Sequence, residues 1–128
     1  MATVLVVDDE RPILTLLKRM LGKEHNVIAA ESGIEALAIY ASYFDQIDLV
    51  ITDITMPGMS GLELVARLET LCSRRLPVIF MTGFSELPLE PGGTVVSKPF
   101  SPAAMSDAIK RVIPTSADLR QSPKTGQS

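Results

Sequence analysis

Cysteine is almost absent from this chain, since Cys72 is the only one among 128 residues. A single cysteine excludes both an intramolecular disulfide and a cysteine-rich zinc site, and it favours a reducing cytosol. Long apolar runs are also missing, because no window approaches the roughly 18 apolar residues that a membrane-spanning helix needs. The chain opens on a strand-like run instead of a basic segment followed by an apolar one. We therefore expect a cytoplasmic protein with no secretion signal and no membrane contact.

Excess charge is small as well, with a formal net charge of -3 at pH 7. Such a balance gives no general attraction to nucleic acid, so no nucleic-acid partner is expected. The length, with 46% hydrophobic and 21% charged residues, fits one globular domain and leaves no room for a second. From Pro114 onward the chain is polar and rich in turn-forming residues. We expect a domain over residues 1–114 and a flexible polar tail over residues 115–128.

Apolar runs of strand length alternate with segments of helical period. The expected strands are residues 4–7, 27–30, 49–52, 78–81 and 94–97. Their apolar residues are continuous, which predicts strands buried on both faces. The expected helices lie between Pro12 and Gly22, after the capping boxes Ser32/Glu35 and Ser60/Glu63, and between Ser101 and Pro114. This alternation predicts an α/β fold with a parallel sheet, right-handed crossovers and helices on both faces.

Polar side chains follow four of the expected strands. Asp8 and Asp9 come after the first strand, Asp53 after the third, Thr82 after the fourth and Lys98 after the fifth. The carboxyl ends of parallel strands meet at one edge of the sheet, where ligands bind in such folds. Any one of these residues alone is often a helix cap or a turn residue. Four strands that each deliver a polar group to the same edge indicate a functional site.

These residues stand in motifs that resemble the receiver domain of two-component response regulators. The motifs are the acidic pair in VVDDE, the aspartate in ITDITMPGMSG, the threonine in FMTGF and the lysine in SKPF. The resemblance covers Thr3 to about Ile113. It implies a flavodoxin-like, doubly wound sheet of five parallel strands in the order 2-1-3-4-5. Strands one and three are then neighbours, which brings Asp8, Asp9 and Asp53 into one pocket.

Three carboxylates at one edge repel one another and raise one another's pKa unless a cation is present. All-oxygen ligands with open positions favour Mg²⁺. The resemblance implies that Asp8 and Asp9 hold Mg²⁺, with Asp53 and the backbone carbonyl of Thr55 completing the protein ligands. Without the other motifs, the acidic run reads equally well as a charged helix start favoured by the helix dipole. Glu10 is expected to be a helix-start charge and no more.

Asp53 is the expected phosphoacceptor, because a carboxylate can attack a phosphoryl group to form an aspartyl-phosphate. The donor would be a phosphohistidine on a histidine kinase or a histidine phosphotransfer protein. Mg²⁺ and the ammonium of Lys98 would neutralise the charge on the transferred group. In the family this lysine precedes a cis peptide to proline, and Pro99 stands in the corresponding place.

Thr82 is the expected switch, since its hydroxyl can bond a new phosphoryl oxygen and draw the following loop inward. Gly83 allows close approach of the backbone to the phosphoryl group. Phe84, two residues beyond Thr82, is a candidate shield of the acyl phosphate against water. Ordinary packing is an equally good reading of this phenylalanine.

Two features depart from the usual receiver pattern. Only 15 residues, 83–97, separate Thr82 from Lys98, too few for a helix of about 11 residues, a strand of about 5 and their loops. This segment also contains Pro88 and Pro91, which break helices. We expect the family's fourth helix to be reduced or absent, as in a divergent subgroup of receivers. Val95 stands where many receivers carry an aromatic switch residue, so the usual threonine–aromatic coupling is in doubt.

The expected function is a single-domain response regulator, monomeric or weakly dimeric, that phosphorylates and dephosphorylates itself and is not classed as an enzyme. A C-terminal receiver of a hybrid histidine kinase is the alternative. An aspartate-nucleophile phosphatase is less favoured, because Thr55 occupies the place of the second acid that such enzymes use. A receiver fold used only for protein binding is disfavoured by the intact set of acids, threonine and lysine.

Overall fold

The computed structural model describes residues 2–71, 76–83 and 94–113 of the chain. Within these ranges five strands form one parallel sheet in the order β2-β1-β3-β4-β5. The strands are β1 (Thr3–Val7), β2 (Asn26–Ala30), β3 (Leu49–Asp53), β4 (Val78–Thr82) and β5 (Thr94–Ser97). The predicted flavodoxin-like strand order is therefore confirmed.

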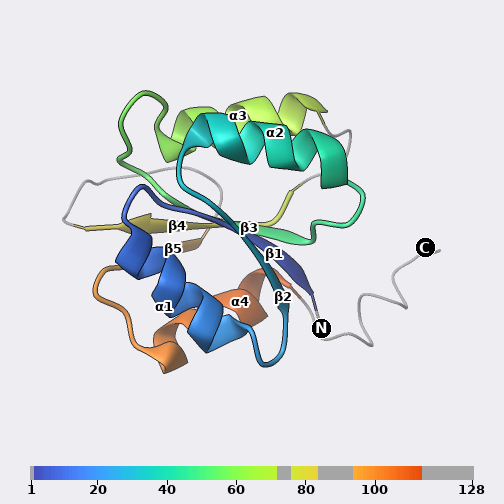
Figure 1. Cartoon of the computed structure of the whole chain (residues 1–128). Helices are drawn as coiled ribbons and strands as arrows, with labels where there is room; N and C mark the ends of the chain where they lie inside the picture. Colours follow the sequence, from blue (N-terminus) through green and yellow to red (C-terminus); the bar gives the residue numbers. More distant parts are fainter. Residues whose placement is uncertain (1, 72–75, 84–93, 114–128) are drawn as a thin grey trace.

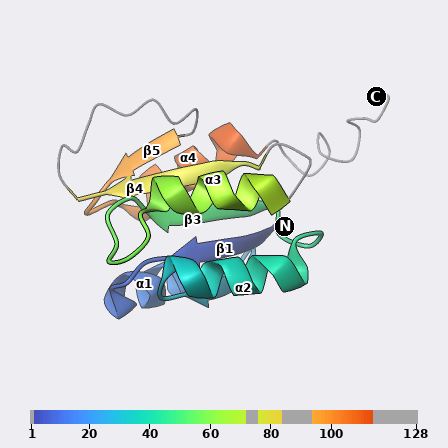
Figure 2. The same cartoon turned by 90° about the horizontal axis from the view of Figure 1, so that it is seen from above.

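Four helices of the described residues cover both faces of the sheet. They are α1 (Arg11–Leu21), α2 (Gly33–Tyr43), α3 (Gly61–Leu71) and α4 (Pro102–Val112). Helices α2 and α3 cover one face and α1 and α4 the other (Figure 1), and Figure 2 shows α2 beside α3 along the sheet. The label α4 belongs to the helix after β5. The helix predicted to be reduced or absent would fall on residues 84–93, which lie outside the described residues, as does the predicted tail at 115–128.

Helix starts follow the capping residues of the sequence. The Ser32 hydroxyl oxygen accepts the backbone N–H of Glu35 at 3.1 Å, and Ser60 accepts that of Glu63 at 3.1 Å. Each bond satisfies one of the N–H groups that a first helical turn leaves unpaired. The carboxylate of Glu35 accepts the backbone N–H of Glu31 at 2.6 Å. The reciprocal half of this capping box therefore reaches one residue further back than the usual pattern.

Side chains that alternate along the strands divide the core into two layers. In β1, Val4 and Val6 pack with α1 and α4, whereas Leu5 and Val7 pack with α2 and α3. The predicted burial on both faces is confirmed for β1, β3 and β4. It is wrong for β2 and β5, because these are the two edge strands and Val95 of β5 remains 38% exposed.

The amino-terminal edge of the sheet is closed by hydrogen bonds from backbone to side chain. The N–H of Ala2 donates to His25 Nδ1 at 3.0 Å, and that of Thr3 donates to Asp48 Oδ2 at 2.9 Å. These bonds hold the start of β1 against the loops before β2 and β3. None of the helices in the described part of the chain is long and apolar enough to span a membrane.

Candidate functional site

The alternation of side chains explains which polar groups meet at the carboxyl edge of the sheet. Val6 of β1 pairs with Ile51 of β3, and both belong to the core layer under α1 and α4. Asp8 and Asp53 lie two residues further along their chains, so they continue on that side. Lys98 follows β5 in the same phase. Strands β1, β3 and β5 thus direct Asp8, Asp53 and Lys98 to the same side of the carboxyl edge.

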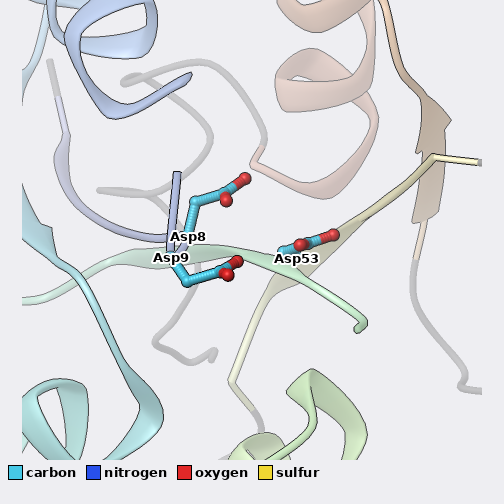
Figure 3. Close-up of side chains that lie close together, drawn as sticks. All are labelled: Asp8, Asp9 and Asp53. Atoms are coloured by element: carbon cyan, nitrogen blue, oxygen red, sulfur yellow. The ribbon is translucent and has the colours of Figure 1, made fainter. Parts of the chain in front are cut away.

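Three carboxylates converge there, those of Asp8, Asp9 and Asp53. Their ligand oxygens all lie within 4.8 Å of one another, and Figure 3 shows the three side chains pointing toward a common space. Asp8 is fully buried and Asp53 is 6% exposed, whereas Asp9 is exposed. The structure therefore brings together the three acids that the sequence predicts as metal ligands, with one of them open to solvent.

Lys98 faces this acidic group from the end of β5. Its ammonium nitrogen lies 2.9 Å from Asp8 Oδ2 and 3.5 Å from Asp53 Oδ2. Its backbone N–H donates to the carbonyl of Thr82 at 2.8 Å, which joins the ends of β4 and β5. The peptide bond from Lys98 to Pro99 is cis. Only 14% of the Lys98 side chain is exposed, so the ammonium is held inside the site.

The electrostatics of the site favour an added cation. Burial, and next the charge of Asp8, raise the pKa of Asp53 to about 6, against the opposing effect of Lys98. Burial also raises the pKa of Asp8, although its bond to Lys98 acts in the other direction. For Lys98 burial lowers the pKa, but the hydrogen bond and charge of Asp8 outweigh it and the pKa is raised. One lysine thus leaves excess negative charge at the site, the condition that a divalent cation relieves.

The remaining predicted site residues lie around this cluster. Thr82 ends β4 and is 3% exposed, and its carbonyl is the one bonded by Lys98. Gly83 follows at the surface, with open space where a side chain would stand. Thr55 is exposed two residues beyond Asp53. Phe84, the predicted water shield, lies outside the described residues.

Helix α3 begins directly against the main chain of Asp53. A Cβ atom added at Gly61 would clash with the Asp53 carbonyl oxygen. The N–H of Gly61 also donates to the carbonyl of Ile54 at 2.8 Å. In the turn between them, Gly58 has a φ of 84°, which favours glycine. Glycine at position 61 therefore allows a helix start to lie against the backbone that carries the central carboxylate.

Glu10 has a contact that the sequence does not reveal. Its side chain makes no capping bond to α1. Its Oε1 atom lies 3.4 Å from the ammonium of Lys98, and its backbone N–H donates to Asp8 Oδ1 at 2.9 Å. The expectation that Glu10 is only a helix-start charge is therefore wrong. The acidic run VVDDE includes Glu10, but the sequence does not show that its partner is Lys98, 88 residues away.

Comparisons with known proteins agree with this geometry. Residues 4–110 match the family model of the response regulator receiver domain. Sporulation initiation phosphotransferase F of Bacillus subtilis (strain 168) is 34% identical over an alignment of 118 residues, and the match covers 87% of this chain and 93% of that protein. A response regulator receiver domain protein from Clostridium thermocellum is 31% identical with a TM-score of 0.82, over 93% of this chain and 99% of that one.

The response regulator protein TrrA from Thermotoga maritima, solved in complex with Mg²⁺-BeF, is 34% identical with a TM-score of 0.77. That match covers 88% of this chain and all of TrrA (100%). Other curated relatives, including histidine kinases and transcriptional regulators, are longer, and the chain spans between 5% and 48% of their lengths. The match of the family model over most of the chain, the five-stranded sheet and the cluster of acids facing a lysine lead to one conclusion: the chain belongs to the receiver domain family of two-component response regulators.

Proposed function

We propose that this receiver domain accepts a phosphoryl group on Asp53 from a phosphohistidine of a histidine kinase or a histidine phosphotransfer protein. The observation that carries the proposal is the buried Asp53 carboxylate, which lies among two further acids and faces Lys98 at 3.5 Å. A carboxylate oxygen of Asp53 forms the new P–O bond as the P–N bond of the donor breaks. The imidazole nitrogen leaves with the electron pair of that bond.

The site fits Mg²⁺. Its donor set consists of oxygens within 4.8 Å of one another, and burial, with neighbouring negative charge as a smaller cause, raises the pKa of both Asp8 and Asp53. Asp8, Asp9 and Asp53, with the backbone carbonyl of Thr55, would hold the ion. When bound, Mg²⁺ neutralises charge on the phosphoryl oxygens. The complex of the relative TrrA with Mg²⁺-BeF supports this choice of metal.

Lys98 and Thr82 complete the proposed machinery from the ends of β5 and β4. Lys98 supplies a fixed positive charge to the transferred group, because its ammonium already lies beside the acceptor carboxylate. The Thr82 hydroxyl bonds a phosphoryl oxygen, and Gly83 leaves space for the backbone to approach. The backbone N–H of Lys98 donates to the carbonyl of Thr82, so a movement of either residue displaces the other.

The test is to incubate the protein with Mg²⁺ and a small-molecule phosphodonor and to record its mass. We expect a gain of one phosphoryl group that hydroxylamine removes, because hydroxylamine cleaves acyl phosphates. Asp53→Ala should show no gain, whereas Asp45→Asn, which replaces an exposed acid in the turn after α2, should behave as wild type. A stable mass gain in the Asp53→Ala variant would contradict the assignment of the acceptor.

A regulatory role without turnover is part of the same proposal. A phosphatase that uses an aspartate nucleophile needs a second acid to protonate the leaving group, and Thr55 offers none. We expect no sustained hydrolysis of a phosphomonoester, and a phosphoryl group taken up from an activated donor should be lost only slowly. Sustained release of phosphate from a phosphomonoester would instead support the phosphatase alternative.

We also propose that the protein acts as a single-domain response regulator, monomeric or weakly dimeric. Its support is the match over 93% of the length of sporulation initiation phosphotransferase F. The C-terminal receiver of a hybrid histidine kinase is the alternative, since the chain also matches small parts of longer kinases. An antibody against this domain distinguishes the two, because extracts of the source cells should show a band of the size of 128 residues and not a much larger one.

A further inference from the structure

We propose that Glu10 is a positioning residue for Lys98, whose ammonium it holds beside Asp8 in competition with Asp53, and that it thereby slows phosphorylation. This inference rests on the proposed role of Asp53 as phosphoacceptor. It concerns a residue outside the three-acid cluster, and it assigns that residue an effect on the rate of transfer.

The contacts of Lys98 carry the first step. Its ammonium lies 2.9 Å from Asp8 and 3.4 Å from Glu10, and Asp53 is the furthest of the three acids at 3.5 Å. The backbone N–H of Glu10 donates to Asp8 Oδ1 at 2.9 Å. Asp8, Glu10 and Lys98 therefore form a closed ring of bonds. Asp8 and Glu10, which both lie in the loop between β1 and α1, attract the ammonium together.

The conformation of Glu10 carries the second step. This residue is the N-cap of α1 with extended backbone angles, φ -100° and ψ 110°, yet its side chain makes no capping bond. A negative charge at this position is favoured by the helix dipole, although the capping bond itself is typical of the shorter Asp and not of Glu. The Glu10 side chain extends to Lys98, while the neighbouring Arg11 pairs with Glu31 at 3.1 Å. The ion pair with Lys98 is therefore the interaction that orients the Glu10 carboxylate.

The third step concerns the charged state of the working site. Asp8 is shared between Lys98 and the metal site, whereas Glu10 is not part of the acidic cluster. If Asp8 served as a ligand of Mg²⁺, Glu10 would be the acid left to compete with the phosphoryl group for Lys98. Its negative charge also repels an anionic donor at short range. Both effects slow transfer, so removing the charge should accelerate it.

The experiment compares initial rates of phosphorylation by acetyl phosphate with Mg²⁺ for wild type, Glu10→Gln, Glu10→Asp and Glu69→Gln. Glu69 is an exposed acid of α3, and its replacement is the matched control. We expect Glu10→Gln to be about three- to tenfold faster than wild type at low ionic strength, at saturating as well as limiting donor. The ratio should shrink in high salt, because the Glu10 side chain is 61% exposed and screened. A purely structural role would not depend on salt in this way.

The shorter variant separates tethering from charge alone. Glu10→Asp keeps the charge but withdraws the carboxylate from Lys98, so we expect a rate between those of wild type and Glu10→Gln. A Glu10→Asp rate equal to wild type, or a Glu10→Gln rate equal to the Glu69→Gln control, would overturn the inference. If wild type itself takes up no phosphoryl group, the proposed function fails and the role of Glu10 fails with it.

Discussion

Replacing Asp53 by Asn should stabilise the metal-free protein at neutral pH. The Asp53 carboxyl is 6% exposed, and burial and the charge of Asp8 raise its pKa from 3.8 to about 6. Asn has nearly the same shape and carries no charge, so it removes the cost of burying a second carboxylate beside Asp8. The residue proposed to be essential for function is therefore predicted to be unfavourable for folding.

The size of the effect follows from the change in pKa. A carboxyl group whose pKa rises on folding binds more protons in the folded than in the unfolded state, here between pH 3.8 and about 6. Stability is then lost as the pH rises through this window, by about 1.4 kcal/mol for each pKa unit. The change from 3.8 to about 6 corresponds to ~3 kcal/mol at pH 7. Loss of the attraction to Lys98 is already included in that value.

Urea denaturation in EDTA measures the difference. We expect Asp53→Asn to exceed wild type by about 1 to 3 kcal/mol at pH 7, with the gap closing toward pH 4. Asp45→Asn is the control, because Asp45 is exposed and makes no contact with the acidic cluster. A destabilised Asp53→Asn protein, or a gap that does not change with pH, would refute the reasoning.

Magnesium should narrow the difference in stability between the two proteins. Wild type gains stability by mass action from any ligand that binds only the folded state, about 2.7 kcal/mol at a concentration 100 times Kd. Asp53→Asn lacks one of the three acids and should gain less. Equal stabilisation of the two proteins by Mg²⁺, measured in the same titration, would show that Asp53 does not contribute to the metal site.

Further replacements test single contacts of the fold. Gly61→Ala should cost about 2 kcal/mol in urea denaturation, because the new Cβ clashes with the Asp53 carbonyl. Gly83→Ala is the control and should change stability by less than about 0.5 kcal/mol, because no atom of the described residues, its chain neighbours apart, lies within 4 Å of a Cβ added there. Equal effects of the two replacements would be inconsistent with the close approach of Gly61 to Asp53. Ser101→Ala should lower the thermal midpoint through loss of about 1 kcal/mol, because the hydroxyl caps α4 by accepting the N–H of Ala104 at 3.0 Å; restoration by Thr but not by Val is the check on the cap. His25→Ala should also cost about 1 kcal/mol, because His25 Nδ1 accepts the N–H of Ala2 at 3.0 Å; amide exchange at Ala2 should rise in this variant, and unchanged exchange would argue against the bond.

The placement of Asp8 and Asp53 at one edge of the sheet could be predicted from simple regularities, and their proximity followed from the strand order that the resemblance to receiver domains implies. Continuous apolar runs separated by helical segments imply a parallel sheet, and residues at the carboxyl ends of its strands share one edge. The phase of two residues per repeat then places side chains on one side or the other. The capping roles of Ser32 and Ser60 could also be predicted, because their hydrogen bonds join residues only three positions apart in the sequence.

The contact of Glu10 and the exposure of Val95 could not be predicted in this way. An acid after a strand has the same local sequence whether it caps a helix or reaches a lysine 88 residues away, and only the folded chain decides. Likewise, Val95 and Val96 are adjacent apolar residues that fit a buried strand, but the position of β5 at the edge of the sheet leaves Val95 exposed. Contacts and exposure cannot be predicted from local sequence where they depend on which distant residues the fold places next to a side chain.

The start of α3 against the Asp53 carbonyl has a mechanical consequence. The side chain of Asp53 lies on the α1 and α4 side of the sheet, while its main-chain oxygen touches the first residue of α3 on the opposite side. Asp53 is therefore in contact with both layers that pack on the sheet. Any force that pulls on its carboxylate is transferred within a single residue to a helix in the other layer, without a relay of intervening side chains.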